Sequence, residues 1–108
     1  MQERSAIQSA ALQDLKEAHY SALSIWQAIK HAIDTAQNRR TERHRLLNGY
    51  IARARTMTGE SAAIITAEFG RLEREGEAGG KLIAALMAAE SEARDEVLRL
   101  TQELVSRN

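Results

Sequence analysis

Two heptad patterns, separated by one turn signal, constrain this chain more than any other feature of its sequence. The first pattern predicts one helix from about Ser5 to about Met57. Eleven of its fourteen positions are apolar, in the series Leu12, Leu15, His19, Ala22, Trp26, Ile29, Ile33, Ala36, Arg40, Arg43, Leu47, Tyr50, Ala54 and Met57. The sequence contains no proline, so no residue of the kind that breaks a helix interrupts this run.

A turn is predicted at Thr58-Gly59-Glu60-Ser61, and a second helix after it. Gly59 can take the left-handed conformation that ends a helix, and Thr58 or Ser61 can cap the next one. Ten of the fourteen positions in the second pattern are apolar, in the series Ala62, Ile65, Phe69, Leu72, Gly76, Gly79, Ile83, Leu86, Glu90, Ala93, Val97, Leu100, Leu104 and Arg107.

We therefore predict a single all-α domain over residues 1–108, built as a long antiparallel helical hairpin about Gly59. Strand-forming residues are sparse, with one Trp, two Tyr and one Phe. An alternative treats 37–45 and 76–80 as loops, because glycine weakens a helix interior. The chain would then be a compact bundle of three or four shorter helices.

Folding the second series back on the first brings the defects of the two patterns together. Arg40 then lies opposite Gly79, and Arg43 opposite Gly76. The surrounding stretch of the first helix is basic and that of the second is acidic, so we expect opposite charges in register to favour this pairing. The candidate interaction band consists of Arg39, Arg40, Arg43, His44, Arg45, Glu73, Glu75 and Glu77.

Further apolar residues flank the two predicted seams and make the apolar face wider than a two-helix seam needs. These residues are Leu23, Ile25, Leu46, Ile51, Leu82 and Met87. A lone hairpin has a thin core. We therefore predict that two hairpins associate as a four-helix bundle, which makes a homodimer the expected state.

Composition argues against several kinds of function. Fifteen basic residues balance fifteen acidic ones, and there is no cysteine. His31 has only Asp34 as an acidic neighbour at helical spacing, so we predict no metal site. No paired carboxylates, nucleophile–base set or cofactor cradle is recognisable, so we predict no cofactor, no small-molecule substrate and no enzymatic activity.

The sharpest chemical motif is His44-Arg45-Leu46-Leu47-Asn48, in which the histidine and the asparagine are four residues apart. It resembles the phosphoacceptor box of one class of sensor histidine kinases, which has an H-R-x-x-N signature on the first helix of a dimerising hairpin. This resemblance implies that His44 accepts a phosphoryl group. Neighbouring arginines would favour the phosphate electrostatically.

A third hypothesis is nucleic-acid binding through the arginines of the segment 39–55. These side chains do not form one clean helix face, and no aromatic residues are interleaved with them as a stacking platform.

From the residues alone we expect a non-enzymatic helical protein–protein interaction or assembly module, adaptor or structural, that self-associates and binds a further, unidentified protein. No stretch approaches the apolar length of a membrane span, and Met1 to Ala11 lacks the pattern of a signal peptide. We expect a cytoplasmic protein.

Overall fold

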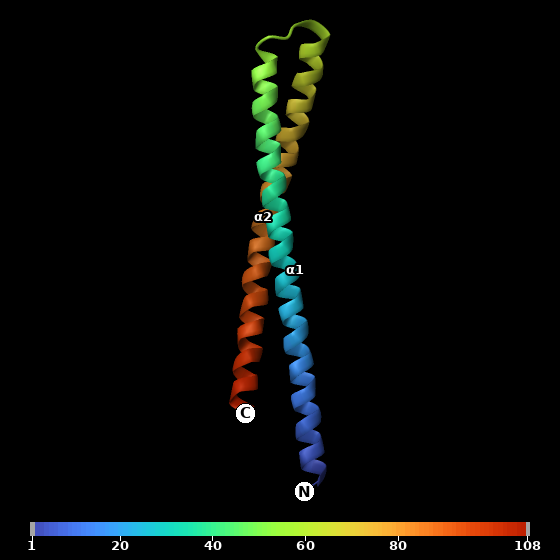
Figure 1. Ribbon diagram of the computed structural model, residues 1–108, viewed down its shortest axis with the longest axis vertical. Coiled ribbons are helices and arrows are strands. Elements are labelled where there is room, and N and C mark those ends of the chain that lie inside the picture. Colours follow the sequence, from blue (N-terminus) through green and yellow to red (C-terminus); the bar gives the residue numbers. More distant parts are fainter. Residues whose placement is uncertain (1, 108) are drawn as a thin grey trace. The chain divides into compact units, whose positions relative to one another are not determined.

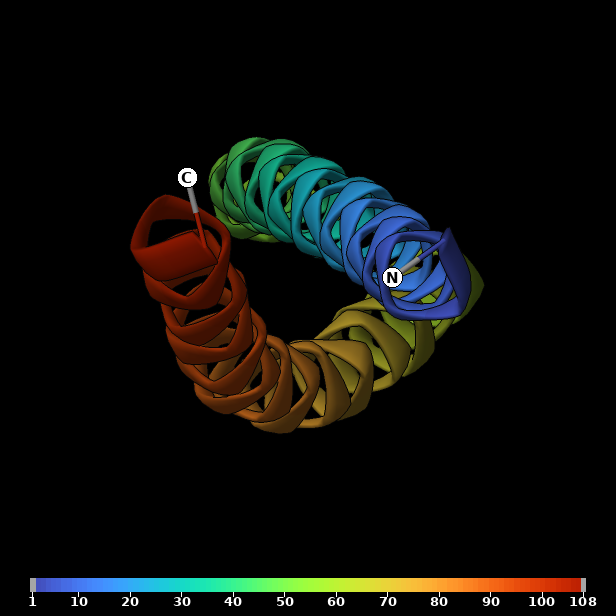
Figure 2. The same cartoon turned by 90° about the horizontal axis from the view of Figure 1, so that it is seen from below.

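The chain folds into two long helices joined by one turn. The computed structural model describes the backbone of residues 2–107 and the side chains of residues 6–107. Helix α1 covers Gln2–Ala54, and helix α2 covers Gly59–Arg107. The two helices run antiparallel (Figure 1), and their ribbons are seen end-on in Figure 2. The predicted all-α class and the hairpin about Gly59 are confirmed.

Both stretches that the alternative treated as loops are helical. Residues 37–45 lie inside α1, and residues 76–80 lie inside α2. The compact bundle of three or four shorter helices is therefore wrong. Each glycine costs a helix about 1 kcal/mol relative to alanine. The apolar positions on both sides of the glycines keep the same spacing, so an unbroken α2 packs both of its halves on α1.

The turn differs from the prediction in detail. Helix α1 ends at Ala54, three residues earlier than expected, and the amide and hydroxyl of Thr56 each donate a hydrogen bond to the Arg53 carbonyl at 3.0 Å. Gly59 has a φ of 66°, in the left-handed region, but it opens α2 and does not end α1. Because α2 already begins at Gly59, Ser61 lies inside its first turn. Neither Thr58 nor Ser61 makes a side-chain capping bond among the described residues.

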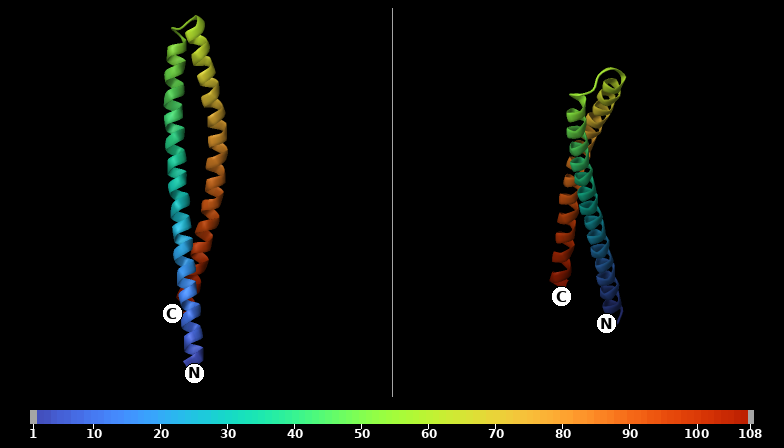
Figure 3. Two further views of the ribbon diagram at one scale, coloured as in Figure 1. Left: turned by 90° about the vertical axis from the view of Figure 1, so that its right-hand side faces the viewer. Right: turned by 45° about the horizontal axis from the view of Figure 1, so that its top comes forward.

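Two compact units make up the fold. The terminal unit consists of Met1–His31 with Met87–Asn108, and the turn unit consists of Ala32–Leu86. Each unit contains one segment of α1 and one segment of α2, which lie beside each other (Figure 3).

The core of the terminal unit is a small cluster of seam residues. Ala22, Val97 and Leu100 are buried, and three partly buried apolar side chains pack against them, namely Leu15, Leu23 and Trp26. The register that places Arg43 opposite Gly76 also places Ala22 opposite Val97, and both residues belong to this cluster. Since every member except Leu23 occupies a seam position, the heptad pattern identified this core correctly.

Among the described side chains of the terminal unit, two hydrogen bonds join α1 to α2. The Trp26 indole donates to Glu90 Oε1 at 2.9 Å, and His19 Nε2 lies 2.9 Å from the Thr101 hydroxyl. The ammonium group of Lys30 lies 4.5 Å from the centre of the Trp26 ring, in a cation–π arrangement. His19 and Glu90, two polar residues at seam positions, are thus each paired across the helices.

The turn unit has an equally narrow core. Ala36, Leu72 and Ile83 are its buried residues, and Leu47, Tyr50 and Phe69 are half-buried at neighbouring seam positions. Along the first predicted seam only Arg40 and Ala54 are exposed, and along the second only Arg107 is. No helix of the described residues is long and apolar enough to cross a membrane.

Two glycines with equally open surroundings provide a test of the turn. A Cβ added at Gly59 or at Gly80 would meet nothing within 4 Å, but Gly59 alone has a positive φ. We expect Gly80→Ala to raise the free energy of unfolding by about 0.5–1 kcal/mol through helix propensity. Gly59→Ala should lower it by about 1 kcal/mol, because an L side chain is strained there. Urea unfolding at one fixed protein concentration measures both, and effects of the same sign would contradict the assignment.

Candidate interaction band

All eight residues of the candidate interaction band lie in the turn unit, on two helix segments. The basic members come from α1 and the acidic members from α2. Seven of the eight are exposed, and Arg43 alone is half-buried. Arg43 is less exposed than the others because its side chain lies over Gly76 and Gly79 of α2.

Arg43 occupies the space that two glycines leave on α2. A Cβ placed on Gly76 would lie 3.5 Å from the Arg43 Cδ atom, and a Cβ placed on Gly79 would lie 2.9 Å from its Nη2 atom. The missing side chains therefore let the arginine lie flat across α2. This confirms the predicted meeting of Arg43 with Gly76.

The space at Gly79 is occupied by Arg43, although Arg40 is the residue predicted to lie opposite this glycine. Arg40 is exposed, and the three atoms nearest to a Cβ on Gly79 all belong to Arg43. The reason is the length of the arginine side chain. From one backbone position, Arg43 extends over two successive layers of the seam, so Gly79 needs no second arginine.

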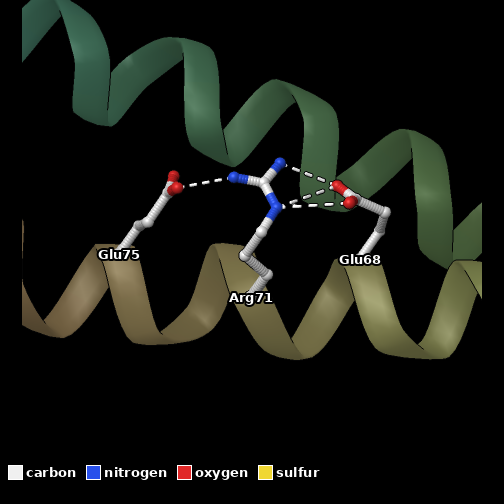
Figure 4. A network of polar contacts seen from close by, with 3 residues as sticks. All are labelled: Glu68, Arg71 and Glu75. Carbon is white, nitrogen blue, oxygen red and sulfur yellow. Dashed lines mark hydrogen bonds and ion pairs between the residues drawn. The ribbon is translucent and has the colours of Figure 1, made fainter.

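The ion pairs of the turn unit are formed within single helices. Arg45 pairs with Glu42 at 2.5 Å, and Arg71 pairs with Glu68 at 2.7 Å and with Glu75 at 2.5 Å. Figure 4 shows the Arg71 guanidinium between the two glutamates. The expected charge pairing between α1 and α2 is not formed by the described side chains. Partners three or four residues away on the same helix are already within reach.

These pairs affect the titration of two carboxyl groups. The hydrogen bond from Arg45 lowers the pKa of Glu42, and the hydrogen bond from Arg71 lowers the pKa of Glu68. A lowered pKa keeps a carboxylate charged to a more acidic pH, and the pair is lost as the pH falls through that lowered value. The two glutamate side chains keep 56% and 40% of their surface exposed, so the contribution to stability is small.

One side of the band is hollowed. The hollow has a volume of about 460 Å³. Three members of the band line it, Arg39, Arg43 and Glu75. The rest of its lining is small or apolar: Ala36, Ala78, Gly79 and Leu82. The other five members of the band lie outside this lining.

Leu82 is the one large apolar residue of this lining, and the band did not include it. Half of its surface is exposed, although it lies at the edge of the hollow. A signal for it was present, since Leu82 follows Glu75 by seven residues and therefore lies on the same side of α2. The band was defined by charge, so it left out Leu82. The sequence pattern places Leu82 only among the apolar residues that flank the seams.

His44 and Asn48 are both exposed on α1, one helical turn apart. Among the described residues, no group of three or more histidine, aspartate or glutamate side chains is arranged to hold a metal ion. Comparison with known proteins adds no assignment, since no family model, curated protein or solved structure matches this chain.

The contact between Arg43 and Gly79 can be measured with a double-mutant cycle. Gly79→Ala adds helix propensity of about 1 kcal/mol but also pushes the Arg43 guanidinium aside. In an Arg43→Ala background only the gain remains. We expect Gly79→Ala to stabilise the background variant more than the wild type, by about 0.5 kcal/mol or more, in urea unfolding. Equal effects in both backgrounds would show that the guanidinium does not rest on this glycine.

Proposed function

We propose that this chain is a non-enzymatic helical interaction or assembly module that self-associates. The observation that carries the proposal is the imbalance between its buried and its exposed apolar residues. Among residues 6–107, six hydrophobic residues are buried, and two of these are alanines. Nine large hydrophobic side chains are exposed: Ile7, Tyr20, Ile25, Ile51, Ile64, Leu82, Met87, Leu98 and Val105.

Association would reduce this exposure. Burial of apolar surface stabilises a fold by about 25 cal/mol per Å². Apolar side chains that stay in water on a two-helix fold add no such stabilisation, and only burial against a partner can add it. A second hairpin is the simplest partner, because it offers the same narrow seam and the same flanking residues. The proposed state is a homodimer forming a four-helix bundle, with further binding of another protein. A cytoplasmic location remains a prediction.

Sedimentation equilibrium tests the proposal directly. We expect a homodimer at tens of micromolar protein, with dissociation on dilution, because part of the exposed apolar surface becomes buried in the four-helix bundle. A monomer throughout that concentration range would contradict self-association.

A second candidate function is phosphotransfer on His44. The observation in its favour is the exposure of His44 and Asn48 on one helix, with His44 within five residues of Arg39 and Arg40, which form no ion pair among the described side chains. An exposed imidazole is accessible to a phosphodonor, and the guanidinium groups would attract its phosphate. Nucleic-acid binding through the arginines of 39–55 has no comparable support from the described side chains.

Phosphotransfer predicts an acid-labile phosphoryl label on the protein after incubation with acetyl phosphate. His44→Gln should abolish the label, because it removes the accepting nitrogen. His31→Gln is the matched control, since His31 is also exposed on α1 and should be dispensable. A label that is absent from the wild type, or unaffected by His44→Gln, would remove this candidate.

A further inference from the structure

The hollow of the turn unit carries an inference about which surface a second copy uses. This inference rests on the proposed self-association and specifies its geometry. In one chain, Arg39 and Arg43 of α1 and Glu75 of α2 line the same hollow. The two helices therefore present opposite charges at the same level of one flank.

The two arginines of the hollow have unused capacity for a carboxylate. All ion pairs of the described side chains in the turn unit belong to Arg45 and Arg71, and none includes Arg39 or Arg43. Glu75 pairs with Arg71 and keeps half of its side chain exposed. A carboxylate accepts several hydrogen bonds at once, so Glu75 can bind a further guanidinium.

The floor of the hollow suits the approach of another helix. Ala36 and Ala78 are small, and they let a second backbone come close. Leu82 stands at the edge with half of its surface exposed.

We infer that a second copy of this chain docks on the flank lined by Arg39, Glu75 and Leu82, about a two-fold axis parallel to the helices. Such an axis places α1 of one copy against α2 of the other. Arg39 of each copy then faces Glu75 of its partner, and Leu82 of each copy lies over Ala36. All neighbouring helices are antiparallel in this arrangement.

The charges also select between two symmetric arrangements. A two-fold axis perpendicular to the helices would place α1 against α1 and bring arginine against arginine. It would also bring Glu75 against Glu75. Like charges in an interface weaken it, so segregation of the basic residues on α1 and the acidic residues on α2 favours the parallel axis.

Two single charge reversals and their mixture test this geometry. Arg39→Glu places two carboxylates against each other at each contact of the dimer, and Glu75→Arg places two guanidinium groups there. We expect each variant alone to dimerise at least ~10-fold more weakly than the wild type, by sedimentation equilibrium. In a one-to-one mixture both contacts become attractive, so a heterodimer should form at near wild-type affinity.

The mixture separates contacts between chains from contacts within a chain. Each variant keeps its own like charges at positions 39 and 75 when it enters the heterodimer. Only the contacts to the partner improve, so recovery on mixing cannot come from repair within one chain. Circular dichroism should show unchanged helical content for both variants, because both positions are exposed on their helices.

Arg40→Glu and Glu77→Arg are the matched controls. They make the same charge changes one or two residues away, outside the lining of the hollow. They should leave dimerisation unchanged. Leu82→Ser should weaken the dimer at least ~10-fold, and Ile51→Ser should not, because Ile51 lies on a different hollow, beside Tyr50 and Phe69.

The outcomes distinguish this inference from the proposed function. A wild type that dimerises while Arg39→Glu and Glu75→Arg have no effect would overturn the docking surface and leave self-association standing. Weakening by the control pair in place of the test pair would place the interface outside the hollow and would also overturn the inference. A monomeric wild type would overturn both proposals.

Discussion

The geometry of two paired helices limits everything else in this fold. A helix in such a pair can bury only one narrow stripe, because most of its circumference faces away from its partner. The buried residues of both units lie on that stripe, and two of the six are alanines. Hydrophobic residues beside the stripe must remain in contact with water or be covered by another molecule. The exposed leucine at the edge of the hollow and the case for self-association both follow from this limit.

Spacing along the chain was sufficient to predict the backbone and the seam. Residues such as Leu72 and Val97 recur at intervals that match the helix repeat, and both are buried. Continuity through 76–80 was harder to predict, since glycine propensity and heptad spacing favour different outcomes there. The packing of α2 on α1 on both sides of the glycines favours the helix. This stabilisation comes from the partner helix, so the local sequence of 76–80 does not reveal it.

Long polar side chains limited what could be predicted of the site. A heptad assigns each residue to one layer, but Arg43 extends over two and fills the space at Gly79, which the register pairs with Arg40. The bond between Trp26 and Glu90 likewise joins residues in neighbouring layers. Both details depend on side-chain reach and rotamer, which spacing does not encode. The hollow is a further example, since it becomes visible only when both helices are in place.

The position of the single tryptophan has a spectroscopic consequence. Trp26 belongs to the terminal unit, where it bonds to Glu90 and lies beneath the Lys30 ammonium group. Indole emission depends on both neighbours, so a fluorescence change reports loss of the contacts between α1 and α2 in that unit. The turn unit contains no indole, and Tyr50 is its phenol. Following fluorescence and circular dichroism together would therefore reveal whether the two units melt in one cooperative transition or separately.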